Sequence, residues 1–137
     1  MVRISVGERL KVGISKEGTR LVFRFSLEEG DRENPTNSFS IGVKTVKVEL
    51  GEFEINNIHP DLIALSSVLI CHPFIGKKLE FPLGVSEEFS ANINRVVSRY
   101  DFISPSDSII QKRIAPENFR MGLAFSGGVD STAALSI

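Results

Sequence analysis

The residues with the clearest chemical potential form the segment Ser126-Gly127-Gly128-Val129-Asp130-Ser131-Thr132. A short continuous apolar run at 121–125, typical of a strand buried on both faces, precedes it, and good helix formers follow it. A glycine turn between a strand and a helix exposes unpaired backbone N–H groups at the positive end of the helix dipole. Gly127 and Gly128 have no Cβ that would keep an oxyanion away from these amides. The segment is therefore predicted to bind phosphate oxygens, with further hydrogen bonds from the hydroxyls of Ser126, Ser131 and Thr132.

Asp130 is the only acidic residue in this turn, and its carboxylate would repel a polyanion. A bridging Mg²⁺ would reverse that repulsion, because hard cations bind carboxylate and phosphate oxygens together. The sequence therefore predicts Asp130 as a metal ligand and Mg²⁺ as a cofactor.

Two common phosphate-binding loops do not fit the segment. Gly122 and Gly127 have the spacing of a Walker loop, but Gly128 stands where that loop needs its lysine. The dinucleotide fingerprint G-x-G-x-x-G is also absent at this turn.

The stretch from Ser126 to Ser131 resembles the PP-loop of the ATP pyrophosphatase superfamily, which includes GMP, NAD and asparagine synthetases and tRNA-modifying enzymes. The resemblance covers residues 119–137, and it implies the first β-loop-α of a doubly wound, Rossmann-like α/β domain that binds ATP. In such enzymes a substrate oxygen attacks the α-phosphorus of ATP and expels pyrophosphate. Ammonia, an amine or a sulfur donor then displaces AMP from the adenylated carbon.

The resemblance also implies roles for the individual residues. The backbone of residues 127–129 and the hydroxyls of Ser126 and Ser131 would hold the departing pyrophosphate, with help from Thr132. Ala124-Phe125 would border the adenine, and Asp130 would reach the phosphates through Mg²⁺. Preorganised donors suit this reaction, because the leaving group gains charge in the transition state.

Residues 119–137 would supply only one strand, the loop and part of a helix of such a domain. We therefore expect the chain to be the truncated, N-terminal part of a longer ATP-dependent enzyme. Ordering a terminal loop costs about 1–2 kcal/mol per residue. The 137-residue chain alone is accordingly expected to be inactive and to bind ATP no more tightly than about millimolar.

Two other functions stay open. In one, residues 1–102 form a non-catalytic module that binds a partner or presents a substrate, and the loop is inert. In the other, this domain docks tRNA for modification. Arg95, Arg99, Lys112, Arg113 and Arg120 would then form an RNA-facing patch, but Arg95 and Arg99 are more simply explained as helix-end charges. The net charge of -1 gives no overall basic excess for nucleic acid. The acceptor, a small molecule or tRNA, and homodimer formation are left undetermined.

The remaining chemically active side chains are better explained by packing or solvation. Cys71 is the only cysteine, so Cys71-His72 predicts a packed thiol beside a helix-terminal histidine. The acidic run 28–31 is typical of a solvated loop. Neither His59 nor His72 has a spacing-based partner for a catalytic triad.

The N-terminal half carries strand patterns. Apolar residues occupy even positions from Val2 to Ile14, and odd positions from Leu21 to Leu27, with a hairpin turn at 16–19 between them. Residues 28–40 have loop composition, and residues 46–50 form a further strand. After Gly51 the apolar phase shifts to Phe53 and Ile55, which indicates a tight turn or bulge.

Two helices follow. The first begins at His59-Pro60-Asp61 and ends before Pro73, with Leu62, Leu65, Leu69, Ile63 and Val68 at helical spacing. A short strand is expected at 79–83. The second helix has Ser86 as its N-cap and one apolar face of Phe89, Ile93, Val96, Val97 and Tyr100. The prediction is an α+β auxiliary domain over 1–102, with several antiparallel strands and two helices, a linker over 103–118, and the incomplete ATP-binding domain over 119–137.

The amino-acid composition favours a folded domain in a reducing compartment. The chain is 42% hydrophobic and 24% charged, which is ordinary for a folded domain. A single cysteine, no secretory signal and no apolar stretch long enough for a bilayer favour a cytoplasmic protein without a membrane partner.

Overall fold

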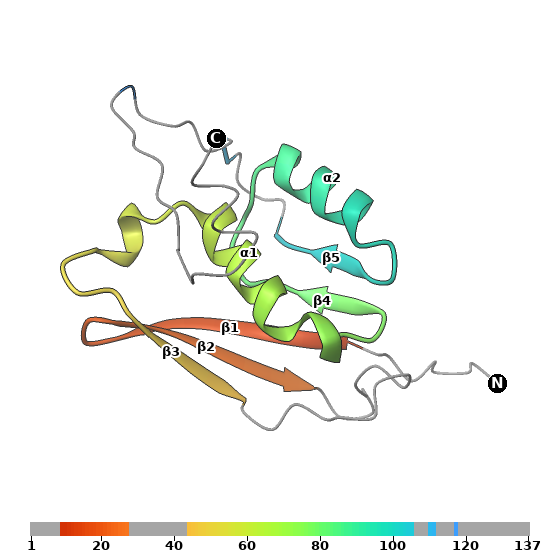
Figure 1. The fold of residues 1–137 in the computed structure, drawn as a ribbon. Coiled ribbons are helices and arrows are strands. Elements are labelled where there is room, and N and C mark those ends of the chain that lie inside the picture. Colours follow the sequence, from red (N-terminus) through yellow and green to blue (C-terminus); the bar gives the residue numbers. More distant parts are fainter. Residues whose placement is uncertain (1–8, 28–43, 106–109, 112–116, 118–137) are drawn as a thin grey trace, which may run out of the picture.

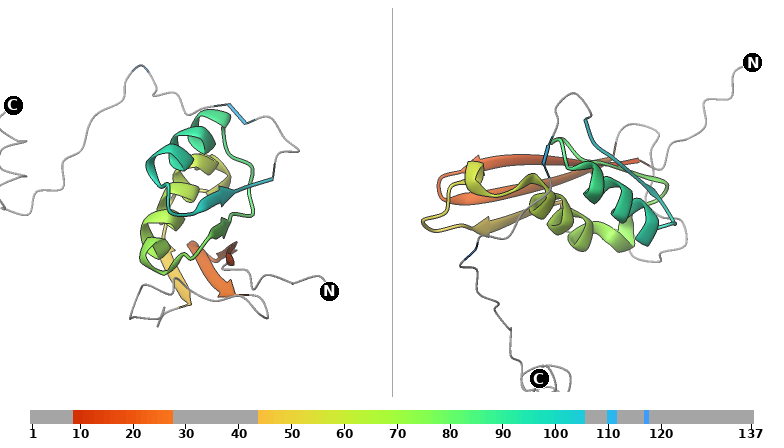
Figure 2. Two further views of the ribbon diagram at one scale, coloured as in Figure 1. Left: turned by 90° about the vertical axis from the view of Figure 1, so that its right-hand side faces the viewer. Right: turned by 90° about the horizontal axis from the view of Figure 1, so that it is seen from above.

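The computed structural model describes residues 9–27, 44–105, 110–111 and 117 (Figure 1). In these residues, five strands form one mixed sheet in the order β3-β2-β1-β4-β5, and two α-helices cover one of its faces (Figure 2). The expected α+β class is confirmed for this part of the chain. The predicted ATP-binding segment, 119–137, lies outside the described residues.

The first three strands form an antiparallel meander. β1 (Arg9–Glu17) pairs with β2 (Arg20–Leu27), and β2 pairs with β3 (Thr45–Glu49). The predicted hairpin turn is confirmed, with Gly18 at a φ of 62°, a conformation that costs glycine little. The predicted period of two is also confirmed, since alternate apolar residues of β1 and β2 point towards the helices and are buried: Leu10, Val12, Leu21, Phe23 and Phe25.

The last two strands are parallel to their neighbours, a direction that the sequence did not predict. β4 (Lys78–Glu80) runs parallel to β1, and β5 (Asp101–Ile103) runs parallel to β4. The helical crossovers before them return the chain to the same end of the sheet. The strand expected at 79–83 ends at Glu80, before Pro82, which has no N–H for a ladder. β5 was not predicted, because three residues show no alternation.

The first helix, α1 (Pro60–Cys71), has the predicted bounds, but its leucines do not form the buried face. Leu62, Leu65 and Leu69 are exposed. The buried positions are Asp61, Ile63, Ala64, Ser67, Val68 and Cys71. Both faces of α1 are apolar, so helical spacing alone could not distinguish the inner face from the outer one.

The second helix, α2 (Glu87–Val96), is shorter than predicted. Its Ser86 N-cap is confirmed, because the hydroxyl accepts from the Phe89 N–H at 3.1 Å. Val96 was expected on the apolar face but is 73% exposed. Tyr100 was expected on the same face, but it follows the helix and is buried immediately before β5.

Two short 3₁₀ helices complete the described chain. Gly51 makes a tight turn after β3 with a φ of 60°, as the shift in apolar phase indicated. The chain then forms η1 (Ile55–Asn57) rather than a continued strand, and Phe53 is exposed. The second 3₁₀ helix, η2 (His72–Phe74), follows α1 directly and contains the Pro73 that ends it.

The hydrophobic core lies between the sheet and the helices. It combines the inner face of the strands with residues of α1, α2 and their connections. The rings of Phe81 and Phe89 pack on Phe102, with centroids 5.9 and 5.6 Å away. The core residues beyond β1 and β2 are Ile63, Ala64, Val68, Cys71, Ile75, Leu79, Phe81, Val85, Ile93, Tyr100 and Phe102.

The opposite face of the sheet is polar. Lys47 pairs with Glu17 at 3.0 Å, and Arg20 pairs with Glu49 at 3.4 Å. The Lys47 ammonium lowers the pKa of the Glu17 carboxyl. Val22 is the buried exception on this face, and the strand register places it between Ser15 and Lys47.

The edge of the sheet at β5 is closed by a side chain. The Asn94 carboxamide of α2 accepts from the Phe102 N–H at 2.9 Å and donates to the Phe102 carbonyl at 3.4 Å. The Phe102 N–H and carbonyl face away from β4. The neighbouring residues of β5 face towards it: the Asp101 N–H donates to Lys77 O, and the Ile103 carbonyl accepts from the Phe81 N–H. The amide thus takes the place of a neighbouring strand at the open edge.

Replacing Gly18 by alanine should lower the free energy of unfolding by about 1–2 kcal/mol, because a Cβ is strained at positive φ. Gly13→Ala is the matched control, since its Cβ would meet only ordinary contacts at 3.7 Å or more. Urea denaturation of both variants measures the difference. Equal free energies of unfolding for Gly18→Ala and Gly13→Ala would contradict the role given to the hairpin turn.

Candidate functional site

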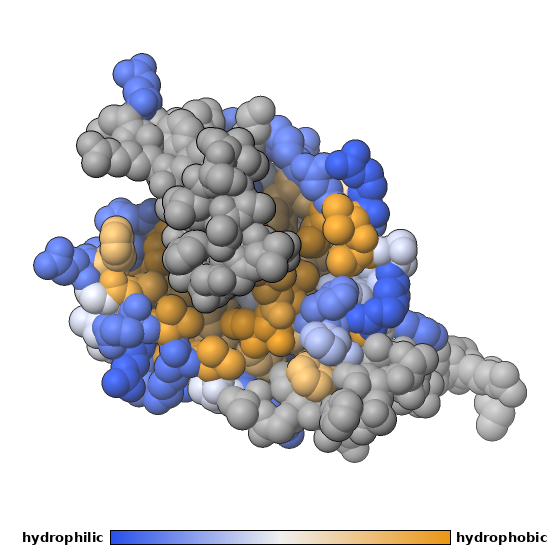
Figure 3. Space-filling model, in the orientation of Figure 1, coloured by the Kyte–Doolittle hydropathy of each residue, from blue (hydrophilic) through white to orange (hydrophobic). Residues whose placement is uncertain are grey.

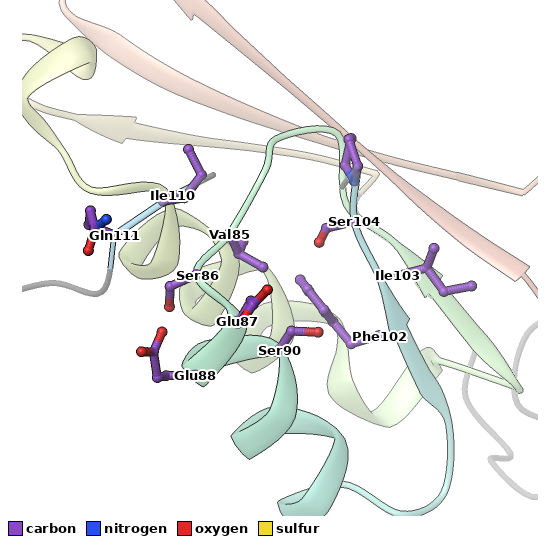
Figure 4. A pocket seen from close by; sticks show the side chains of 11 residues that line it. Val85, Ser86, Glu87, Glu88, Ser90, Phe102, Ile103, Ser104, Ile110 and Gln111 are labelled. Carbon is purple, nitrogen blue, oxygen red and sulfur yellow. The ribbon is translucent and has the colours of Figure 1, made fainter. Parts of the chain in front are cut away.

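A hollow lies between the first turn of α2 and the end of β5 (Figure 4). Its volume is about 530 Å³. We call it the α2 hollow; its lining residues are Val85, Ser86, Glu87, Glu88, Ser90, Phe102, Ile103, Ser104, Pro105, Ile110 and Gln111. It combines an apolar floor with hydroxyls and two exposed carboxylates, so it has the composition of a binding recess.

The Asp61 carboxylate lies beside the α2 hollow and is held by two hydrogen bonds from Ser86. Asp61 lies in the first turn of α1 and is only 9% exposed. It accepts from the Ser86 backbone N–H at 2.9 Å and from the Ser86 hydroxyl at 2.7 Å. That hydroxyl in turn caps α2. One buried carboxylate therefore connects the N-termini of both helices, where the dipoles favour negative charge.

His59 extends this network to the chain beyond β5. Its Nδ1 accepts from the Asp61 N–H at 3.1 Å, so its Nε2 carries the proton. Nε2 lies 2.6 Å from the Gln111 carbonyl and donates to it. His59 thus serves as the N-cap of α1 and fixes residue 111 beside that end of the helix.

The order of these groups excludes a serine-protease type of triad. In a triad the histidine accepts the serine proton and the aspartate orients the histidine. Here the Ser86 hydroxyl donates directly to Asp61, and both atoms of that bond are buried. The Ser86 hydroxyl is held directly by the Asp61 carboxylate, with no histidine between them.

A second polar cluster closes the other end of α1. Arg99 donates to the backbone carbonyls of His72 and Ile75, and its guanidinium lies 5.0 Å from the centre of the Tyr100 ring. These bonds supplement the backbone hydrogen bonding where α1 ends, since the His72 carbonyl also accepts from the Ile75 N–H. The Tyr100 hydroxyl lies 2.8 Å from Nδ1 of His72. Arg99 was predicted as a helix-end charge of α2, but it serves the end of α1 and the η2 turn instead.

Cys71 is a packed core residue, as predicted. Its side chain is fully buried, and Sγ donates to the Ser67 carbonyl at 2.9 Å. Burial raises the pKa of the thiol to about 12, so the nucleophilic thiolate is disfavoured. Within the described residues, no group of three or more histidine, cysteine, aspartate or glutamate side chains could hold a metal ion.

The predicted phosphate-binding loop, 126–132, lies outside the described residues, as does its metal ligand Asp130. The acidic run at 28–31 and the basic residues Lys112, Arg113 and Arg120 also lie outside them. The other two arginines of the predicted basic patch, Arg95 and Arg99, are described. Arg95 bonds Asn92 at 3.2 Å, and Arg99 is engaged at the end of α1.

The pairing of Asp61 with Ser86 could not be seen in the sequence. The two residues are 25 positions apart, and each alone has the ordinary signature of a helix start. The only available signal was that an aspartate and a serine begin two successive helices.

Comparisons with protein-family models, with curated proteins and with solved structures find no match to this chain. In the part of the chain that the structure describes, no helix has the length and apolar character needed to cross a membrane. Functional assignment therefore rests on the residues themselves.

Asp61→Ala should lower the free energy of unfolding by about 2–4 kcal/mol, because it leaves the buried Ser86 N–H and hydroxyl without their charged acceptor. Glu52→Ala, an exposed carboxylate in the turn after β3, is the control and should change stability by less than about 0.5 kcal/mol. Urea denaturation measures both. A loss at Asp61 no larger than at Glu52 would refute the connecting role.

The only tyrosine, Tyr100, should ionise late. Burial raises its pKa from 10.0 to about 12, against the lowering effect of Arg99. Tyrosinate absorbance at alkaline pH reports this residue alone. We expect a midpoint near 12 in the folded protein and near 10 in denaturant. Because the unfolded chain releases this proton first, stability should fall as pH rises from about 10 to 12; one midpoint for both states would contradict the buried position.

Proposed function

We propose that this chain contributes the PP-loop of an ATP-dependent enzyme that adenylates its substrate and releases pyrophosphate. The observation that carries the proposal is the segment Ser126–Thr132, with two glycines, three hydroxyls and one carboxylate between an apolar run and helix-forming residues. In this proposal the segment begins a Rossmann-like α/β domain, and the α+β domain before it is an auxiliary domain.

The proposed chemistry uses donors that this chain supplies. The amides of residues 127–129 and the hydroxyls of Ser126 and Ser131 hold the β- and γ-phosphates and stabilise the charge that develops as pyrophosphate leaves. Thr132 adds a further hydroxyl. A nucleotide held by these donors would present its α-phosphorus in line with the substrate oxygen.

The donor set of the loop also suits a hard cation, because Asp130 offers carboxylate oxygens beside hydroxyl oxygens. Mg²⁺, when bound, neutralises phosphate charge. Asp130 would be its ligand from this chain.

The acceptor substrate is a small molecule or tRNA in this proposal. No described surface distinguishes the two, and the α2 hollow, at about 530 Å³, falls within the usual size range of small-molecule pockets. A cytoplasmic location remains a prediction, supported by the single buried thiol of Cys71.

Gly128→Val in the complete protein should reduce ATP-dependent pyrophosphate release by at least about 100-fold, because side-chain bulk blocks the amides that serve as oxyanion donors. Ser131→Ala should reduce it less, since one hydroxyl is lost. Ser136→Ala, outside the motif, is the matched control and should retain activity.

Pyrophosphate is measured with a coupled assay over a panel of amines, carboxylic acids and tRNA. Turnover that survives Gly128→Val would refute the role of the loop. If the wild-type protein neither binds ATP nor releases pyrophosphate, the alternative of a non-catalytic module with an inert loop takes its place. Salt-dependent RNA binding in the same protein would favour the tRNA-modifying class.

A further inference from the structure

The outer face of α1 carries an exposed apolar row that nothing in the described structure covers. Leu62, Leu65 and Leu69 follow one another at helical spacing and are 38%, 40% and 70% exposed. We call these three residues the leucine stripe. Figure 3 shows hydrophobic surface over this part of the molecule.

The absence of charge from the helix makes the stripe unusual. Asp61 is the only charged residue of α1, and it is buried against Ser86. By contrast, α2 carries Glu87, Glu88 and Arg95. A surface helix normally has a polar outer face, whereas a helix that is apolar all round is normally enclosed by protein. The leucine stripe therefore has the character of an interface.

The structure shows that the chain after β5 returns to the N-terminal end of this helix. The hydrogen bond from His59 to the Gln111 carbonyl holds residue 111 beside the N-terminal end of α1, the end at which Leu62 lies. The ten residues from Gln111 to Met121 can span up to roughly 33 Å. That reach exceeds the length of α1, roughly 18 Å for twelve residues.

Residues 119–137, which follow this part of the chain, contain several apolar side chains. Met121, Leu123 and Phe125 form its apolar run, and Leu135 follows the loop. This run has no place beside β5, because Asn94 already bonds the Phe102 N–H and carbonyl at that edge of the sheet. Burial of the run against the described domain therefore requires side-chain contact with an apolar surface.

We propose that the leucine stripe is the docking surface for residues 119–137, so that the segment bearing Ser126–Thr132 is carried against the outer face of α1. Two parts of one chain joined by a short linker meet at an effective concentration in the roughly millimolar range. A second copy at micromolar concentration competes poorly with such a neighbour. The docking does not require the loop to bind ATP, so it stands or falls separately from the proposed function.

Hydrogen exchange of the complete protein without nucleotide tests the docking. Leu69→Glu places a charge in the leucine stripe, and Val96→Glu, an equally exposed apolar position at 73%, is the matched control on α2. We expect amides of residues 119–137 to exchange at least about tenfold faster in Leu69→Glu than in wild type, and to be unchanged in Val96→Glu. Amides of β1 and β2 should keep their protection in both variants, which shows that the domain remains folded.

If Leu69→Glu disturbs β1 and β2, the milder pair Leu65→Ser and Leu69→Ser replaces it with the same expectation. Equal exchange of residues 119–137 in the stripe variants and in Val96→Glu would overturn the proposal. Light scattering identifies the rival occupant: a dimer that Leu69→Glu dissociates, with exchange of 119–137 unchanged, would assign the stripe to a second copy and also overturn it.

Discussion

The described domain depends on one buried carboxylate. Asp61 sits in the first turn of α1 and accepts two hydrogen bonds from Ser86, which begins α2. A buried charge is costly unless donors surround it, and here the donors are the groups that a helix start must satisfy anyway. The arrangement fixes the two helices relative to each other, and it places the first turn of α2 over the end of β5, where the α2 hollow forms.

Polar side chains also bind backbone groups at the end of α1 and at the edge of the sheet. Arg99 binds carbonyls at the end of α1 and in the η2 turn, and Asn94 binds both backbone groups of Phe102 at the edge of the sheet. Each of these side chains comes from the part of the chain around α2. The short strands β4 and β5 contribute few ladder bonds, so contacts from α2 and its flanks supply much of what keeps this half of the sheet together.

The two layers of the domain differ in what they present outward. The free face of the sheet carries ion pairs such as Lys47 with Glu17, which suits contact with water. The outer face of α1 carries leucines and no charge. Exposed leucines without charge give the outer face of α1 the character of a protein interface.

The sequence by itself determined the elements whose signals are local. The β1–β2 hairpin follows from alternation and from Gly18, and both helix starts follow from Pro60 and Ser86. The chemistry of Ser126–Thr132 was also read from residue types and spacing, and it remains a prediction because that segment lies outside the described residues. Only the tertiary structure decided which face of α1 is buried, that β4 and β5 run parallel, and that Asp61 meets Ser86. The physical reason is that these features are set by partners distant along the chain: an apolar helix can bury either face, and a three-residue strand exists only because its neighbours bond it.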